Sequence, residues 1–401
     1  MAVQEYQAPE SVSRLQLRAF GVGGFALVLA ISGALRSPDK FYPSYLMSFM
    51  LVLGLALGSL GLVMLQHLVT GHWGIILRRP LESATRTLPL LVVFFLPIAL
   101  FGMKYLYSGH DNEKGWLNAP ASGEGALSDF QKSYLTTQGF YIRALIYFAL
   151  WLALMFVFNI LSKQQDTNQA DRALRRRLKM LAGPGIILYV FAMSFASIDW
   201  VMSLSPHWAS TIYGFLFVAG QLISSMAFMI AVVVLLSRTE PFASVLQKRH
   251  LHDLGKLLLA FVMLWAYFDF SQLLIIWSGN QPEEISFYRT RLYGGWGVVA
   301  VIVLVFHFFV PFFLLLSEDV KRNAKVLPKI AMWLILMRLV DLYWMTRPEF
   351  TSRAMPTWLD LVLPIALGGL WLGFFAFNLK QCPLLPIGDP KLAEAIEHHE
   401  R

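Results

Sequence analysis

This sequence contains little cysteine and few charged residues. Cys382 is the only cysteine among 401 residues, and 14% of the residues are charged. A single thiol excludes an intrachain disulfide, a four-cysteine iron–sulfur site and a C-x-x-C-H haem attachment motif. Soluble domains contain about 25% charged residues, so the low charge also argues against an ordinary soluble domain.

Hydrophobic residues make up 57% of the chain and gather in long runs. A helix of roughly 20 apolar residues is long enough to cross a bilayer. The first 13 residues are polar and no small-residue cleavage site follows the first run, so we expect that run to remain in place as its own insertion signal. The pattern predicts an all-α integral membrane protein with about ten transmembrane helices, near residues 19–35, 44–69, 88–106, 139–161, 181–202, 212–236, 257–277, 296–316, 330–346 and 358–379.

The distribution of Lys and Arg predicts the orientation of these helices. The loops on the N-terminal side, together with the C-terminal tail, carry 22 of the 33 basic residues, and the opposite loops carry 8. Cytoplasmic loops are enriched in Lys and Arg, so both termini are expected to be cytoplasmic. We interpret the basic runs, including Arg78, Arg79 and Arg86, as topology signals on a solvated surface rather than as a nucleic-acid-binding face.

Spans two to five and spans six to nine resemble two copies of one four-helix unit. Each copy begins after an outer turn that contains proline, at Pro43 and at Pro206. Four spans is an even number, so both copies point the same way, as parallel repeats do. The predicted organisation is a tail and flanking span at 1–41, a four-helix bundle at 42–203, a second four-helix bundle at 204–346, and a flanking span with a cytoplasmic tail at 347–401.

Aromatic residues are concentrated at the predicted outer turns. Trp and Tyr commonly form belts at the level of the lipid headgroups, and we interpret most of these residues in that way. Stacking on a quinone is a second possibility for one or two of them. The set comprises Tyr42, Tyr107, Trp116, Trp200, Trp208, Trp277, Tyr288, Tyr293, Trp296, Trp344 and Trp358.

Ionisable residues inside the predicted spans are few. The run at 255–280 carries Asp269 well inside it, and an ionisable group at that depth costs a few kcal/mol unless it is paired, hydrated or neutralised. We therefore expect Asp269 to face protein and to have a partner elsewhere in the chain. The other candidates are Asp199, His307, Arg338 and Asp341, of which the last two are three residues apart and share a helix face.

Two interpretations of these five residues compete. Paired charges inside a membrane often only lock helices together. Carboxylate–histidine chains also mark proton paths, and oxidation of a quinol needs a nearby base and a proton exit. A transmembrane haem b needs two facing histidines, and His307 alone lies deep, so we expect no redox centre in this chain, no metal and no catalytic residue.

Four stretches carry a resemblance to a known family. They are HWGIILRRPLESATRTLPLL (72–91), DWVMSLSPHWASTIYGFLFVAGQ (199–221), HDLGKLLLAFVMLWAYFDFSQLLIIWSGNQPEEISFY (252–288) and RLVDLYW (338–344). They resemble the F subunit of bacterial alternative complex III, a quinol:cytochrome c (or other periplasmic acceptor) oxidoreductase. The resemblance extends over spans two to ten.

The resemblance implies a fold, a location and a set of partners. The fold is that of the polysulfide-reductase-type (NrfD-like) membrane subunit, with two four-helix bundles and two flanking spans, in the bacterial inner membrane. The implied partners are a related membrane subunit (C), an iron–sulfur subunit, multihaem and monohaem cytochrome c subunits and small anchored subunits, so that haem c and iron–sulfur clusters lie in the partners. A terminal oxidase, lipid and a quinone are further possible partners.

The resemblance leaves three hypotheses for function. The chain is a cofactor-free scaffold that possibly conducts protons, or it carries its own quinol site, or it is a secondary transporter. An inverted repeat, or paired Gly/Pro-broken segments in corresponding halves, would favour the transporter, and neither is evident in the sequence.

Overall fold

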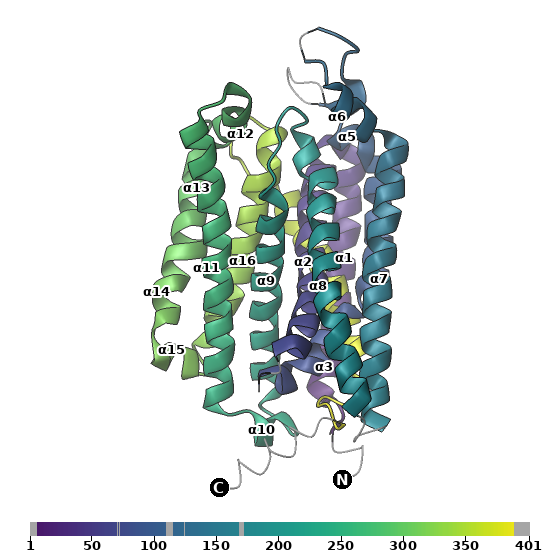
Figure 1. The fold of residues 1–401 in the computed structure, drawn as a ribbon, viewed down its shortest axis with the longest axis vertical. Helices are drawn as coiled ribbons and strands as arrows, with labels where there is room; N and C mark the ends of the chain where they lie inside the picture. The colour runs from purple at the N-terminus through teal and green to yellow at the C-terminus, as the bar shows by residue number, and fades with distance from the viewer. Residues whose placement is uncertain are drawn as a thin grey trace.

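The computed structural model describes residues 6–69, 71, 73–109, 115–123, 125–167 and 172–388, and these residues form helices and no strand (Figure 1). Nine of the described helical segments are long and apolar enough to cross a membrane. The prediction of a multi-pass helical membrane protein is confirmed at this level. The predicted cytoplasmic tail beyond Gly388 lies outside the described residues.

The long helices follow the predicted spans, and several extend beyond them. They are α1 (Glu10–Arg36), α2 (Pro38–Val69), α7 (Thr137–Thr167), α8 (Arg172–Trp200), α9 (Tyr213–Leu236), α11 (Lys248–Gly279), α16 (Leu327–Thr346) and α17 (Leu359–Leu379). Two further segments contain a turn of π-helix: α4 (Leu88–Pro97) continues through η2 (Ile98–Gly102) into α5 (Met103–Leu106), and α13 (Trp296–Val303) continues through η5 (Leu304–Phe309) into α14 (Val310–Leu316).

Short helices occupy connections that the sequence had suggested to be loops. Ser128 begins α6 (Asp129–Tyr134) with a capping box, in which its side chain and that of Gln131 each accept from the other residue's backbone N–H. The remaining short elements are α3 (Trp73–Thr85), η3 (Trp116–Asn118), η4 (Met202–Leu204), α10 (Phe242–Val245), α12 (Pro282–Leu292), α15 (Glu318–Arg322) and η6 (Arg347–Glu349).

Helix α16 corresponds to the predicted ninth span but is too polar to count among the nine apolar segments. It carries Lys329, Arg338 and Asp341 within 20 residues. It nevertheless packs along α9 through its length. A helix with this many charges inside a membrane must bury them against protein, so α16 is the part of the fold where a polar site is expected.

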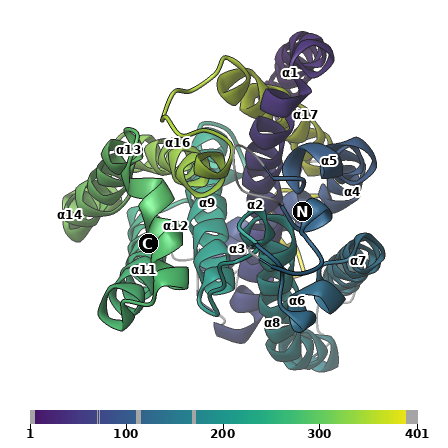
Figure 2. The same ribbon diagram turned by 90° about the horizontal axis from the view of Figure 1, so that it is seen from above.

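Helix α2 lies at the centre of the molecule, packed between α9, α8 and α17 (Figure 2). Its apolar stretch is buried throughout. At Gly58 a side chain would collide with the backbone of Gln221 in α9, so glycine allows the two helices to approach closely. Helices α1 and α17 pack along each other on one side, and α11, α13 and α14 lie on the other.

The two described chain ends meet at one end of the molecule. The backbone N–H of Leu384 donates to the carbonyl of Tyr6 over 2.9 Å. We call this the terminal end, and the opposite end, which carries α6 and α12, the far end (Figure 1).

The aromatic residues of the far end do not form the predicted lipid-facing belt. Trp200 and Trp296 are fully buried, and six others of the set are at most 9% exposed. Trp277, Tyr293 and Trp358 are the ones that face outward. The interpretation as a belt is therefore wrong for most of the set: these rings pack against each other inside the molecule, as Trp200 does against Phe95 with ring centroids 4.7 Å apart.

Candidate functional site

The structure gathers four of the five predicted residues in one half of the molecule, around the indole of Trp265. Asp269 lies one helical turn after Trp265 on α11, His307 lies in η5, and Arg338 and Asp341 lie on α16. The rings of Trp265 and His307 are 4.4 Å apart, and Trp265 also lies beside the carboxyl group of Asp341. We call these five residues the Trp265 cluster.

Arg338 and Asp341 form an ion pair inside the protein. A nitrogen of the Arg338 guanidinium donates to Oδ2 of Asp341 one turn further along α16, and both side chains are at most 3% exposed. The guanidinium also lies 5.5 Å from the ring centre of Phe217 on α9. The aromatic face and the carboxylate together compensate the buried positive charge.

His307 is buried in a helix whose hydrogen-bond pattern is interrupted. The segment Leu304–Phe309 forms a π-turn directly before Pro311, which has no N–H to donate. The indole of Trp333 donates to the carbonyl of Phe306 over 2.9 Å, so a side chain of α16 fills part of the gap in the ladder. Neither ring nitrogen of His307 has a partner of hydrogen-bond geometry among the described residues, and the backbone of Met337 on α16 lies beside the ring. An unsatisfied buried imidazole is a candidate for contact with a proton or a water molecule.

Asp269 differs from the expectation derived from the sequence. Its side chain is half-buried rather than enclosed, and among the residues that the structure describes it makes no hydrogen bond or ion pair. It lies within electrostatic range of Arg338 and Asp341, which pair with each other instead. The predicted direct partner of Asp269 is therefore wrong, because Asp341 on the same helix as Arg338 is the nearer acceptor.

Polar side chains lie between Asp269 and the far end of the molecule. Gln272, one turn further along α11, is 4% exposed and accepts from Oγ of Ser210 over 3.1 Å. Its amide lies 3.5 Å from the hydroxyl of Tyr288 on α12. Polar side chains thus continue from the Trp265 cluster to the connections at the far end.

Asp199 is not part of the Trp265 cluster. It lies at the end of α8 in the other half of the molecule, where its Oδ2 accepts from Arg143 over 2.8 Å and from the Tyr147 hydroxyl over 2.7 Å. Its Oδ1 is buried without a partner in the described part of the chain. Arg143 in turn lies under the ring of Tyr134, 3.9 Å from its centre.

A cavity of about 440 Å³ opens beside this second acidic site. It lies between α6 and the far end of α8, and its walls include Tyr134, Phe195, Met202 and Trp208. Burial and the neighbouring Asp199 carboxylate raise the pKa of the Tyr134 phenol to about 12, so the hydroxyl stays neutral and available as a donor. Small-molecule sites commonly have this size and this mixture of apolar walls with a few polar groups.

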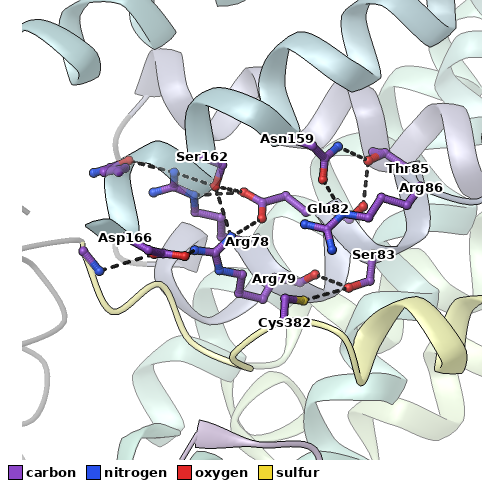
Figure 3. Close-up of polar contacts among 12 residues, drawn as sticks. Arg78, Arg79, Glu82, Ser83, Thr85, Arg86, Asn159, Ser162, Asp166 and Cys382 are labelled. Carbon is purple, nitrogen blue, oxygen red and sulfur yellow. Dashed lines mark hydrogen bonds and ion pairs between the residues drawn. The ribbon is translucent and has the colours of Figure 1, made fainter. Parts of the chain in front are cut away.

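A third polar cluster, which the sequence did not indicate, lies at the terminal end (Figure 3). Arg78 and Arg79, which we had assigned to a solvated loop, lie in α3 and are at most 2% exposed. Both guanidinium groups pair with the fully buried carboxylate of Glu82, over 3.1 Å and 2.6 Å. The spacing of these residues by three and four positions is the signal in the sequence for this cluster, and a count of basic residues by loop does not detect it.

Helix α7 and the C-terminal segment complete this terminal cluster. Ser162 on α7 donates to Glu82, and Asp166 forms an ion pair with Arg79. Asp166 also accepts from the backbone N–H of Gly388 over 3.4 Å, and the thiol of Cys382 lies 3.7 Å from Oγ of Ser83. These contacts join α3, α7 and the C-terminal segment, so we interpret the cluster as a lock between elements.

Within the described ranges, no group of three His, Cys, Asp or Glu side chains is arranged to hold a metal ion. Neither a protein-family model nor a curated protein sequence matches this chain. The functional assignment therefore depends on the arrangement of the residues and on the resemblance described above.

Proposed function

We propose that this chain is an integral membrane subunit of a respiratory quinol:cytochrome c oxidoreductase of the alternative complex III type, and that it conducts protons without holding a redox centre. The Trp265 cluster is the observation that carries the proton-conducting part of the proposal. The four stretches of resemblance, which include Asp199, Asp269, Arg338 and Asp341, support the assignment to the complex.

The proposal includes a topology of ten spans. Nine crossings would leave the chain ends on opposite sides, whereas Leu384 and Tyr6 are hydrogen-bonded to each other. Counting α16 as a crossing resolves this difference. We propose that spans two to five and six to nine form two four-helix bundles, that α1 and α17 flank them, and that the terminal end faces the cytoplasm of a bacterial inner membrane because it carries the excess of Lys and Arg.

Each residue of the Trp265 cluster has a role in the proposed path. An isolated carboxylate in apolar surroundings is much less stable than its neutral acid, so Asp269 is suited to take up and release a proton. The ion pair of Arg338 and Asp341 contributes to the electrostatic potential that a proton at Asp269 experiences. His307 can accept a proton on one ring nitrogen and release a proton from the other. Gln272 and Ser210 provide the connection to the far end.

Affinity purification tests the assignment to the complex. A tag on this chain, expressed in its native host, is expected to retain subunits that contain haem c and iron–sulfur clusters, measured by absorbance spectra and iron content of the eluate. A chain that elutes intact and alone in mild detergent would contradict the proposal and favour the secondary transporter.

Substitution of the acidic residues tests the proton path. Asp269→Asn and Asp341→Asn in the assembled complex are expected to lower quinol turnover and proton release in proteoliposomes by about a hundredfold or more, the lower end of the effect of losing a proton-transfer group. Asp253→Asn is the matched control, since Asp253 is on the same helix, 42% exposed and paired with Lys256. If both variants keep full proton release, the cluster only locks helices together.

The cavity beside Asp199 supports a second candidate function, a quinol site in this chain. A quinol ring against Tyr134 and Trp208 would lie near the carboxylate of Asp199, whose Oδ1 is free to accept a proton. A photoreactive quinone analogue is expected to label residues of α6 and α8 if this site is used. Labelling confined to another subunit would remove this second candidate.

A further inference from the structure

A cleft of about 770 Å³ opens at the terminal end, away from all three polar sites described above. It lies between the end of α9, the first residues of α11 and the loop that follows α15. None of the residues in its walls belongs to the proposed proton path. The cleft therefore needs an explanation of its own.

Most of the charged residues in the walls of the cleft are basic. Lys248, Arg322 and Lys325 line it, with Asp319 as the single acidic residue. Arg322 is paired with Glu318 over 2.5 Å, whereas no ion pair is found for Lys248 or Lys325 in the described part of the chain. The two unpaired ammonium groups are exposed and free to bind an anion.

A buried cation, Lys321, directly precedes the wall residue Arg322 in α15. Lys321 on α15 is 7% exposed, and its stem packs against Gly255 of α11. Its Nζ lies 3.4 Å from the carbonyl of Leu316 and has no carboxylate within ion-pair distance among the described residues. A buried charge without a counter-ion is costly, and an anion bound nearby would reduce that cost.

The start of helix α11 forms part of the wall of the same cleft. Gln247 and His250 cap each other's backbone N–H groups there, but the N–H of Lys248 and that of the next residue remain without an intrahelical acceptor. The N-terminus of a 32-residue helix carries a partial positive charge and is a common place for a phosphate to bind.

We propose that this cleft binds the phosphodiester of an anionic phospholipid in the leaflet at the terminal end. The lipid-facing side of α14 ends three residues before Asp319, which lines the cleft: Phe313 is 64% exposed and Leu316 is 53% exposed. Acyl chains can therefore lie along α14 while the phosphate reaches the ammonium groups of Lys248 and Lys325. A free phosphate ion would use the same cations but would gain nothing from the apolar wall.

Native mass spectrometry of the full-length chain in mild detergent tests this proposal. Titration with phosphatidylglycerol is expected to give a saturable adduct, and titration with phosphatidylcholine is not. The variant K248Q/K325Q is expected to weaken phosphatidylglycerol binding by about fivefold for each removed cation. K256Q is the matched control, because Lys256 is on the same helix and exposed but does not line the cleft.

Three results would overturn the proposal. They are equal binding of the zwitterionic lipid, undiminished phosphatidylglycerol binding by K248Q/K325Q, and complete displacement of the lipid by millimolar inorganic phosphate. The last result would assign the cleft to free phosphate. Thermal unfolding of each variant in the same detergent verifies that the substitutions leave the fold intact, and Lys248 and Lys325 are exposed enough to expect that.

Discussion

Gly220 on α9 lies directly against the guanidinium of Arg338 on α16. A Cβ atom at position 220 would overlap with Cζ, Nη1 and Nε of that guanidinium. Because Gly220 has no side chain, the guanidinium of Arg338 fits against α9 while it pairs with Asp341. One glycine on a neighbouring helix positions the charge of the Trp265 cluster.

The first prediction concerns this glycine. Gly220→Ala is expected to push Arg338 away from Asp341 and to destabilise the fold by about 1–3 kcal/mol, as overpacking of a core does. Gly368→Ala on α17 is the control, since nothing lies within 4 Å of its added Cβ, and it is expected to be neutral or stabilising by up to about 1 kcal/mol. Unfolding of both variants in detergent measures the difference. Equal stability of the two would show that Arg338 has room to move.

The second prediction concerns the ion pair itself. Arg338→Met leaves the Asp341 carboxylate buried without its partner and is expected to cost about 3–5 kcal/mol. The double variant Arg338→Met/Asp341→Leu removes both charges and is expected to recover most of that loss. Unfolding of the single and double variants in detergent gives the coupling energy. A double variant that is stable but transports no protons would separate the functional role from the packing role.

The third prediction concerns the terminal cluster. Glu82→Gln removes the carboxylate that both Arg78 and Arg79 contact, and it is expected to destabilise the fold by about 3–5 kcal/mol. Glu318→Gln breaks an ion pair with Arg322 that is about half exposed, so its effect is expected to stay below about 1 kcal/mol. Thermal unfolding compares them, and similar losses for both would contradict the role of the cluster as a lock.

The sequence predicted the positions of the helices because hydrocarbon-length apolar runs have few other solutions in a membrane. It also predicted that Arg338 and Asp341 share a face, since a spacing of three residues decides this locally. The sequence did not predict that Arg78 and Arg79 are buried. A count of basic residues by loop cannot distinguish a solvated cation from one that is buried against Glu82.

Long-range packing explains the remaining differences. The spacing of Arg338 and Asp341 allows them to pair, but the local sequence does not show the space beside Gly220 on α9 that admits the guanidinium. The belt interpretation failed for a related reason: Trp200 and Trp296 lie near helix ends, where both a headgroup belt and an aromatic core place tryptophan, and the packing of neighbouring helices decides between the two.

The fourth prediction concerns the exposed side of Asp269. Its neighbours Tyr267 and Phe270 are more than 60% exposed on the lipid-facing surface of α11. Dicyclohexylcarbodiimide enters from the lipid phase and reacts with protonated carboxyl groups. It is expected to modify Asp269 first, because Asp269 is unpaired beside this surface, whereas Asp341 is buried and paired with Arg338. Mass spectrometry of peptides from the treated protein locates the adduct, and Asp269→Asn is expected to abolish it. If Asp341 is modified before Asp269, the proton resides in the ion pair. The proposed path would then start on α16 instead of α11.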